Sequence, residues 1–438
     1  MIIHSYFRCL AALATGWGIM LSADAAITVK CTPDHADHLY RSSEPVRLTF
    51  AADDDGRPLP RHPICYTLRQ EDGLTAGGEI ITGPDGTAVL TTALQQPGFL
   101  ILATTAPDGQ RTSLTGIGCE PEKIAIDAHR PADFDQFWEK QLRLLEEVPL
   151  QELAAIPVEV EPGYRPQVEA FDVKVSAYGE RPVSGYLSMP KDARPGSLPA
   201  FVWFHGAGVH SSTINADIAA QGLLAFNVNA HGIENGRDKA YYQELDSGEL
   251  QNYFLSGRTD RERYYFRNMF LRVVRALEYL KSRPEWDGKN LIVFGGSQGG
   301  AQALVAAALD QDVNYCFAQV PWMCNFRGAE TGCHIPEWPG FLPPPDDPDY
   351  AAACRTLPYY DMINFAGRIG CHTEITVGFV DEVCCPSGVY AMFNALRSRE
   401  KTIFPVPSEG HGDSIIYVKG VEQMLAVLKK LQETEPAP

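Results

Sequence analysis

Apolar positions follow two different patterns along the chain. Between residues 26 and 120, apolar and polar residues alternate in short runs, as at Val46-Leu48-Phe50 and Ile64-Tyr66-Leu68. Turn tripeptides such as Asp54-Asp55-Gly56 separate these runs. Alternation with a period of two predicts strands that bury one face. This part of the chain is therefore expected to form a small all-β sandwich.

Residues 121–438 carry a different pattern. An amphipathic helix is predicted from Asp133 to Val148, and a longer one, with one buried face, from Arg261 to Arg283. Near-continuous apolar runs alternate with the helical patterns, which indicates a mostly parallel sheet covered on both faces. The predicted strands of this sheet are Ala200 to Phe204, Leu223 to Val228, Leu291 to Phe294, Phe317 to Val320, Ile375 to Val380 and Ile403 to Val406.

Length and composition fit two folded domains. The 438 residues exceed the usual size of one domain, and 45% of them are hydrophobic. We predict an immunoglobulin-like sandwich over residues 26–120 and an α/β domain over residues 121–438. The formal net charge of −18 repels phosphate backbones and anionic lipid surfaces, so nucleic acid is not an expected partner. A neutral sugar or ester is compatible with this charge.

The first 25 residues have the form of a cleaved signal peptide. Arg8 precedes an apolar run from Cys9 to Met20, and the small residues Ala23 and Ala25 have the spacing that signal peptidase accepts. The alternative, a transmembrane anchor, needs about 20 apolar residues, and this run is shorter. We therefore expect a secreted or periplasmic protein with no integral membrane span. Export permits disulfides among the ten cysteines that remain after cleavage.

A glycine-rich turn carries the clearest chemical signal. Gly295-Gly296-Ser297-Gln298-Gly299 lies between the predicted strand that ends at Phe294 and a helix of small residues from Ala301 to Leu309. This is the G-x-S-x-G nucleophile turn in its strand-turn-helix context. A phosphate-binding turn would show a different glycine spacing or a lysine, and neither is present. The turn predicts an α/β-hydrolase with a doubly wound, mostly parallel sheet.

A serine nucleophile needs a histidine base and a carboxylate that orients it. In this class the chain order is serine, acid, histidine. His411 follows the last predicted strand, and Asp381 ends the strand before it, so we predict Ser297, Asp381 and His411 as the catalytic residues. Glu382 is the alternative acid.

The oxyanion of acyl transfer needs backbone donors. The N–H of Gln298 opens the helix after the serine, and the N–H of Ala207 follows the strand that leads into His205-Gly206. We predict these two amides as the oxyanion hole. His205 is the alternative base, although it precedes Ser297 in the chain.

These motifs resemble carbohydrate esterase family seven, the acetyl xylan esterases and cephalosporin C deacetylases. The resemblance rests on Pro131 to Trp138, Phe204-His205-Gly206, Gly296 to Gly299, Asp381-Glu382-Val383 and His411. It implies hydrolysis of acetyl esters on small sugars, independent of metal or cofactor. The chain departs from the family where Ala230-His231-Gly232 stands in place of Arg-Gly-Gln and where Gly412 stands in place of Glu.

We therefore predict a secreted serine esterase that removes acetyl groups from carbohydrate. Its partners are an acetylated oligosaccharide or small ester, and a homo-oligomer stays open because the added sandwich could block the family's ring. Two other functions stay open as well. A serine peptidase of the prolyl-oligopeptidase kind shares the serine turn but needs a large propeller domain, and a carbohydrate-binding surface protein would need no catalysis.

Overall fold

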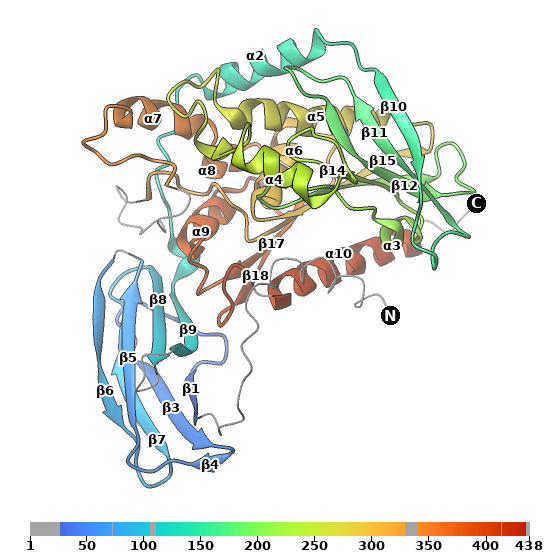
Figure 1. The fold of residues 1–438 in the computed structure, drawn as a ribbon. Coiled ribbons are helices and arrows are strands. Elements are labelled where there is room, and N and C mark those ends of the chain that lie inside the picture. The colour runs from blue at the N-terminus through green and yellow to red at the C-terminus, as the bar shows by residue number, and fades with distance from the viewer. Residues whose placement is uncertain (1–26, 72, 106–110, 329–339, 413, 435–438) are drawn as a thin grey trace. The chain divides into compact units, whose positions relative to one another are not determined.

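The computed structural model describes residues 27–71, 73–105, 111–328, 340–412 and 414–434 (Figure 1). They form two compact units. The first contains the described residues up to Ile124 together with Gly378–Asp381 and Val406–Val418. The second contains Ala125–Val377, Glu382–Pro405 and the remainder of the C-terminal part.

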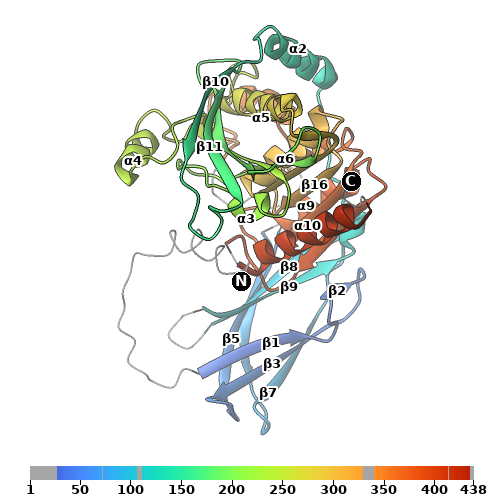
Figure 2. The same ribbon diagram turned by 90° about the vertical axis from the view of Figure 1, so that its right-hand side faces the viewer.

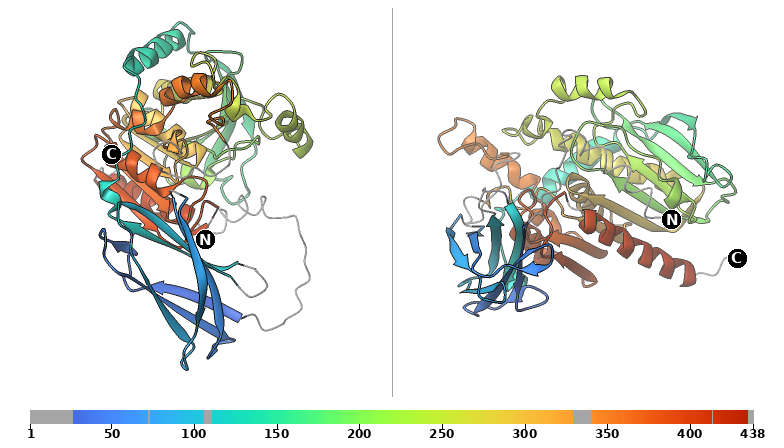
Figure 3. Two further views of the ribbon diagram at one scale, coloured as in Figure 1. Left: turned by 90° about the vertical axis from the view of Figure 1, so that its left-hand side faces the viewer. Right: turned by 60° about the horizontal axis from the view of Figure 1, so that its bottom comes forward.

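Residues 27–119 of the first unit, here called the β-region, form two sheets. One contains β1 (Ile27–Pro33), β3 (Val46–Asp54), β4 (Arg57–Pro58) and β7 (Thr87–Thr92). The other has the order β2 (Leu39–Tyr40), β9 (Arg111–Cys119), β8 (Gly98–Thr105), β5 (Pro63–Gln70) and β6 (Thr75–Ile81). Figure 2 labels strands of both sheets, and Figure 3 gives two further views of them.

Both sheets of the β-region contribute to one apolar core. Leu48 and Phe50 from β3 are fully buried, and so are Leu102 from β8 and Ile117 from β9. Along β3 the buried Val46, Leu48 and Phe50 alternate with the exposed Arg47 and Thr49, as the sequence predicts. The all-β character of this region follows from that pattern.

The second unit is organised around one large sheet. Among the described residues its order is β10-β11-β12-β14-β13-β15-β16-β17-β18. The strands from β14 to β17 pair in parallel, whereas β10, β11 and β12 form an antiparallel edge. The strands are β10 (Glu152–Val158), β11 (Val168–Val175), β12 (Val183–Pro190), β13 (Leu198–Phe204), β14 (Leu224–Val228), β15 (Trp286–Gly296), β16 (Tyr315–Gln319), β17 (His372–Gly378) and β18 (Lys401–Val406).

The α-helices of the described residues are labelled in Figure 1, and Figure 2 shows them from another side. They are α2 (Phe134–Glu146), α3 (Ala216–Ala219), α4 (Lys239–Ser247), α5 (Tyr265–Ser282), α6 (Gln298–Leu309), α7 (Tyr350–Thr356), α8 (Met362–Ala366), α9 (Pro386–Ala395) and α10 (Ser414–Thr434). Among them α3, α5 and α6 contact several strands of the sheet. The predicted α/β fold with a large parallel sheet is confirmed. The predicted helix from Arg261 begins later, at Tyr265, because turns closed by hydrogen bonds to Gly257 and Asp260 occupy the preceding residues.

Three expectations concern export: a signal peptide, the absence of a membrane span and the possibility of disulfides. The predicted signal peptide lies outside them. Within them, no helix has both the length and the apolar character that a membrane span requires. Nine cysteines of the described part are thiols, so none of the disulfides that export would permit is formed among them.

Candidate active site

Ser297 occupies a strained turn between β15 and α6. Its backbone has φ 57° and ψ −121°, a conformation that a residue with a side chain rarely adopts. The serine N–H donates to the carbonyl oxygen of Gln319 (2.9 Å), and the serine carbonyl accepts from the N–H of Trp322 (3.0 Å). These bonds hold the turn against β16 and the segment after it. The structure thus places Ser297 in the strand-turn-helix setting that the sequence predicts.

The glycines around the serine are required by close packing. A Cβ atom on Gly299 would lie 2.0 Å from the carbonyl oxygen of Phe204, and one on Gly295 would lie 2.3 Å from the carbonyl oxygen of Gly299. Real Cβ atoms do not approach backbone oxygens so closely. The two glycines let α6 start directly against β13 and β15, which presents the serine at the end of the sheet.

The loop after β13 borders this turn. A Cβ atom on Gly206 would lie 3.9 Å from the Cβ of Ser297 and 3.7 Å from the carbonyl oxygen of Gly296. Ala207, whose N–H is a predicted oxyanion donor, is the next residue in this loop. Gln298, which carries the other predicted donor, is the first residue of α6. The two amides therefore belong to segments that adjoin the serine.

His205 has a structural role in the same loop. Its Nδ1 is 2.7 Å from the carbonyl oxygen of Gly206, to which it donates, and its Nε2 accepts from the N–H of Ala230 (3.1 Å). Burial lowers the pKa of this imidazole well below its usual value, and the nearby His210 and His231 lower it further. Both ring nitrogens are engaged and the ring is neutral, which argues against His205 as the base.

His231 holds the loop from the other side, and the sequence reasoning did not find this role. Its Nε2 donates to the carbonyl oxygen of Gly208 (3.1 Å), and its Nδ1 accepts from the hydroxyl of Tyr265 (2.7 Å). Burial lowers the pKa of His231 to about 3. The signal in the sequence was the departure from the family motif at Ala230-His231-Gly232, because a changed motif indicates a changed set of contacts.

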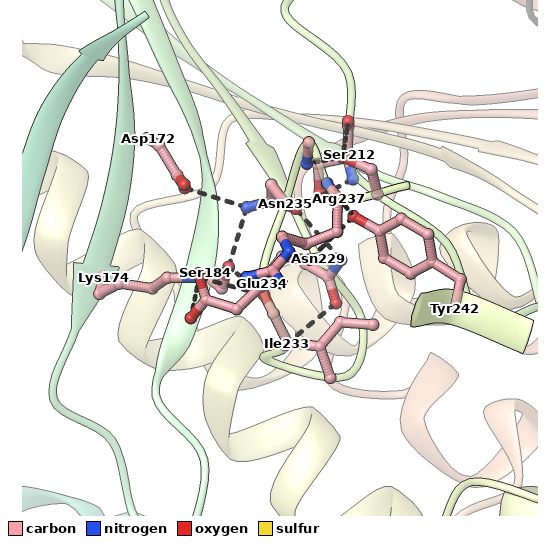
Figure 4. A network of polar contacts seen from close by, with 12 residues as sticks. Asp172, Lys174, Ser184, Ser212, Asn229, Ile233, Glu234, Asn235, Arg237 and Tyr242 are labelled. Carbon is pink, nitrogen blue, oxygen red and sulfur yellow. Dashed lines mark hydrogen bonds and ion pairs between the residues drawn. The ribbon is translucent and has the colours of Figure 1, made fainter. Parts of the chain in front are cut away.

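The segment that carries His231 is fixed by a buried polar network (Figure 4). Asn235 donates to Asp172 (3.1 Å) and to Ser184 (2.9 Å), and Lys174 donates to Ser184 (2.8 Å). Figure 4 shows these side chains converging from β11, β12 and the loop after β14. These hydrogen bonds join the loop after β14, which carries His231, to β11 and β12.

Asp381 and His411 form a carboxylate–imidazole pair in the first unit. Asp381 follows β17 and its side chain is fully buried, while His411 follows β18 and its side chain is 21% exposed. Nδ1 of His411 is 2.9 Å from Oδ2 of Asp381. This bond fixes the orientation of the imidazole ring relative to the carboxylate. The neighbouring Glu382, the alternative acid, is exposed.

Aromatic side chains near the serine turn pack against one another. The rings of Trp322 and Phe341 are 4.8 Å apart, and those of Phe326 and Phe341 are 4.5 Å apart. All three side chains are buried. Trp338, a further aromatic residue of the same segment, lies outside the described residues. The contacts among the other three show that they form a packed cluster.

The mostly parallel sheet and the strained serine turn define the α/β-hydrolase-like class. A family model described as acetyl xylan esterase matches residues 123–428. The acetyl esterase Axe7A of Xylanibacter ruminicola is 30% identical over 391 residues, which cover 85% of each chain. The chain therefore belongs to the acetyl xylan esterase family, and it is a carboxylic ester hydrolase. The predicted family resemblance is confirmed.

Solved structures agree with this assignment. The acetyl xylan esterase from Paenibacillus sp. R4 is 26% identical, with a TM-score of 0.61, and the match covers 70% of this chain and 98% of that one. Acetyl xylan esterase 1 from Thermoanaerobacterium sp. JW/SL YS485 is 24% identical with a TM-score of 0.57, which shows a shared fold. Its match covers 70% of this chain and 97% of that one.

Proposed function

We propose that the protein removes acetyl groups from carbohydrate by a serine mechanism in which Ser297 is the nucleophile, His411 the base and Asp381 the acid. The observation that carries this proposal is the 2.9 Å contact between His411 and the buried Asp381, which come after consecutive strands in the chain order of the class. Family membership and the strained serine turn support it. Acetylated carbohydrate is the substrate class because the relatives are acetyl and acetyl xylan esterases.

The mechanism needs only groups of this chain and water. His411 Nε2 takes the proton of the Ser297 hydroxyl as Oγ attacks the ester carbonyl carbon. The oxyanion that forms accepts hydrogen bonds from the backbone N–H groups of Gln298 and Ala207. The sugar oxygen then leaves with the proton held by His411, and an acetyl-enzyme remains. Water attacks this ester with the same base, and acetate is released. Asp381 accepts the Nδ1–H of His411 and stabilises the imidazolium.

The experiment that tests this proposal is acetate release from acetylated xylooligosaccharide. We expect turnover that is unchanged by prior dialysis against a chelator, because no step uses a metal. Cleavage of a proline-containing peptide in place of acetate release would favour the peptidase alternative. Absence of both activities in the folded protein would favour the carbohydrate-binding alternative.

The acyl group is expected to be acetyl. The cluster of Trp322, Phe326 and Phe341 borders the serine turn through the bond between Trp322 and Ser297, so it limits space near the nucleophile. Forcing extra methylenes into packed space costs about 1–3 kcal/mol, or about 5- to 150-fold in specificity. We expect kcat/KM to fall from 4-nitrophenyl acetate to butyrate to octanoate. A maximum at octanoate would contradict an acetyl-specific site.

The remaining parts of the proposal concern export and domains. Residues 1–25 act as a signal peptide and residues 26–120 form an immunoglobulin-like sandwich. Residues 121–438 form the catalytic domain, although Gly378–Asp381 and Val406–Val418 belong to one compact unit with the β-region. The apolar run before Ala23 and the two sheets that share a core support this division. The test is the mass and N-terminal sequence of the exported protein, which we expect to begin at Ala26.

A further inference from the structure

Two strands of the β-region contact the segments that carry Asp381 and His411, and all these residues belong to the first unit. The N–H of Gly116 in β9 donates to the carbonyl oxygen of Pro407 (3.0 Å). The ring of Phe99 in β8 lies 4.9 Å from the ring of Phe379, at 59°. Phe379 is two residues before Asp381, and Pro407 is four residues before His411.

The contact at Gly116 has no spare space. A Cβ atom there would lie 2.3 Å from the Cβ of Phe379 and 2.7 Å from the carbonyl oxygen of Pro407. Phe99 is 1% exposed and Phe379 is fully buried. The backbone of β9 therefore lies directly against both segments, and only glycine permits this approach.

The two segments are also fixed to each other. A Cβ atom on Gly378 would lie 2.2 Å from the carbonyl oxygen of Glu409, and the N–H of Phe379 donates to the carbonyl oxygen of Val406 (3.4 Å). Movement of one segment therefore moves the other. The position of the carboxylate–imidazole pair depends on both.

The strand β9 is itself held at the point of contact. Nδ1 of His38 donates to the carbonyl oxygen of Gly116 (2.9 Å), and the N–H of Gly118 donates to the carbonyl oxygen of His38 (3.0 Å). The contact with Phe379 and Pro407 is thus made by a part of β9 with fixed backbone bonds on both sides of Ile117. This arrangement suits a rigid support.

We propose that the β-region positions the acid–base pair of the active site, with Gly116 and Phe99 as the positioning residues. This inference rests on the proposed function, because it concerns the pair that serves as acid and base there. The β-region touches neither reacting atom. It acts by holding Phe379 and Pro407, and through them the bond between Asp381 and His411.

Gly116→Ala tests the proposal in the full-length protein. The added methyl group must displace Phe379 or Pro407, and a misplacement of about 1 Å can cost about 100-fold in turnover. We expect kcat for 4-nitrophenyl acetate to fall about 10- to 100-fold while KM stays within about twofold. The labelling rate of Ser297 by a fluorophosphonate should fall in parallel, because labelling needs the base.

Gly77→Ala is the matched control. Gly77 lies in β6 of the same sheet, and its added Cβ would be 2.9 Å from the carbonyl oxygen of Tyr66, within the β-region alone. We expect wild-type kcat from this variant. If both variants lose activity only in proportion to the folded fraction measured by circular dichroism, or if Gly116→Ala keeps wild-type kcat, the proposal is wrong.

If Gly116→Ala does not fold, Phe99→Ala tests the positioning role instead. This substitution removes the contact with Phe379 without adding an atom. We expect a lower kcat at unchanged KM, with recovery in Phe99→Leu, which restores apolar contact with Phe379. Phe50→Ala, in the core between the two sheets, controls for loss of stability and should leave kcat unchanged well below its unfolding temperature. Equal kcat values for the Phe99 and Phe50 variants would overturn the proposal.

Ser297→Ala distinguishes a failure of the proposed serine mechanism from a failure of the proposed positioning role of the β-region. Activity retained by this variant would refute the proposed serine mechanism. An inactive Ser297→Ala together with a fully active Gly116→Ala would leave that mechanism intact and refute the positioning role of the β-region.

Discussion

The serine turn and the carboxylate–imidazole pair are built in different ways. The turn lies within five consecutive residues, and Gly295 and Gly299 make it possible by their lack of side chains. Asp381 and His411 are 30 residues apart, and their segments rest on Gly116, which lies 265 residues before Asp381. One half of the machinery is local in the chain, and the other half depends on distant contacts.

The same requirement, a residue without a side chain where backbones approach closely, can be recognised in the sequence at one position and not at another. Gly299 and Gly116 are both required because a backbone approaches closely. Gly299 belongs to a short sequence motif together with Gly295, so the motif itself indicates that a side chain is not tolerated there. Around Gly116 the partners Phe379 and Pro407 are far away in the chain, so this glycine looks like any other residue of a strand.

The largest expected effect is at the serine turn. Ser297→Ala should lower kcat/KM for 4-nitrophenyl acetate by up to about 10⁶-fold, because no other group can form the acyl-enzyme. Thermal unfolding should be unchanged, since only one hydroxyl oxygen is lost. A variant with activity near that of the wild type would show that the nucleophile lies elsewhere.

At the carboxylate–imidazole pair, Asp381→Asn should lower kcat by about 10⁴-fold. The amide favours the wrong tautomer of His411, with the proton on Nε2. Glu382→Gln is the matched control, because that side chain is exposed, and it should be nearly as active as the wild type. The reverse result in steady-state kinetics would assign the acid to Glu382.

Glycine substitutions sharpen the contrast between the turn and the loop that carries the base. Gly299→Ala should lower the free energy of unfolding by about 3 kcal/mol or more, because its Cβ would meet the backbone of Phe204. Gly412→Ala should change it by less than about 0.5 kcal/mol, because nothing lies within 4 Å of that Cβ. Urea denaturation measures both, and similar losses would contradict the difference in packing.

A second buried carboxylate provides a comparison for Asp381. Asp361 accepts N–H groups from Asn325 (3.2 Å), Phe326 (2.8 Å) and Ile363 (2.9 Å), and no imidazole is among these partners. Burial raises the pKa of this carboxyl from 3.8 to about 6, although these hydrogen bonds oppose the shift. Its role is therefore structural, at the start of α8.

The raised pKa of Asp361 predicts a dependence of stability on pH. Between about pH 4 and 6 the folded protein holds a proton that the unfolded chain has lost, so stability falls as the pH rises, by at most about 3 kcal/mol. Asp361→Asn should be less stable overall because an amide nitrogen would face an N–H donor. Its deficit relative to the wild type should shrink between pH 4 and 6. A constant deficit in urea denaturation would show that the carboxyl is ionised throughout.

Several features could be predicted from sequence because they depend on short-range chemistry. Alternation along β3 predicts a strand of the β-region, and the apolar runs of β13 to β16 predict a parallel sheet. The family motifs point to an ester hydrolase. The antiparallel edge of β10, β11 and β12 was missed, because in β10 and β11 exposed and partly exposed residues weaken the apolar pattern.

The amino-acid sequence alone predicted the serine turn, since Gly-x-Ser-x-Gly between a strand and a helix has few other uses. It also limited the acid and the base to few candidates through the order of the strands. Tertiary structure alone decided that Asp381 lies buried against His411, and that His205 and His231 hold the loop of Ala207. The physical reason is that these roles depend on burial and on hydrogen-bond partners far apart in the chain, which no local pattern records.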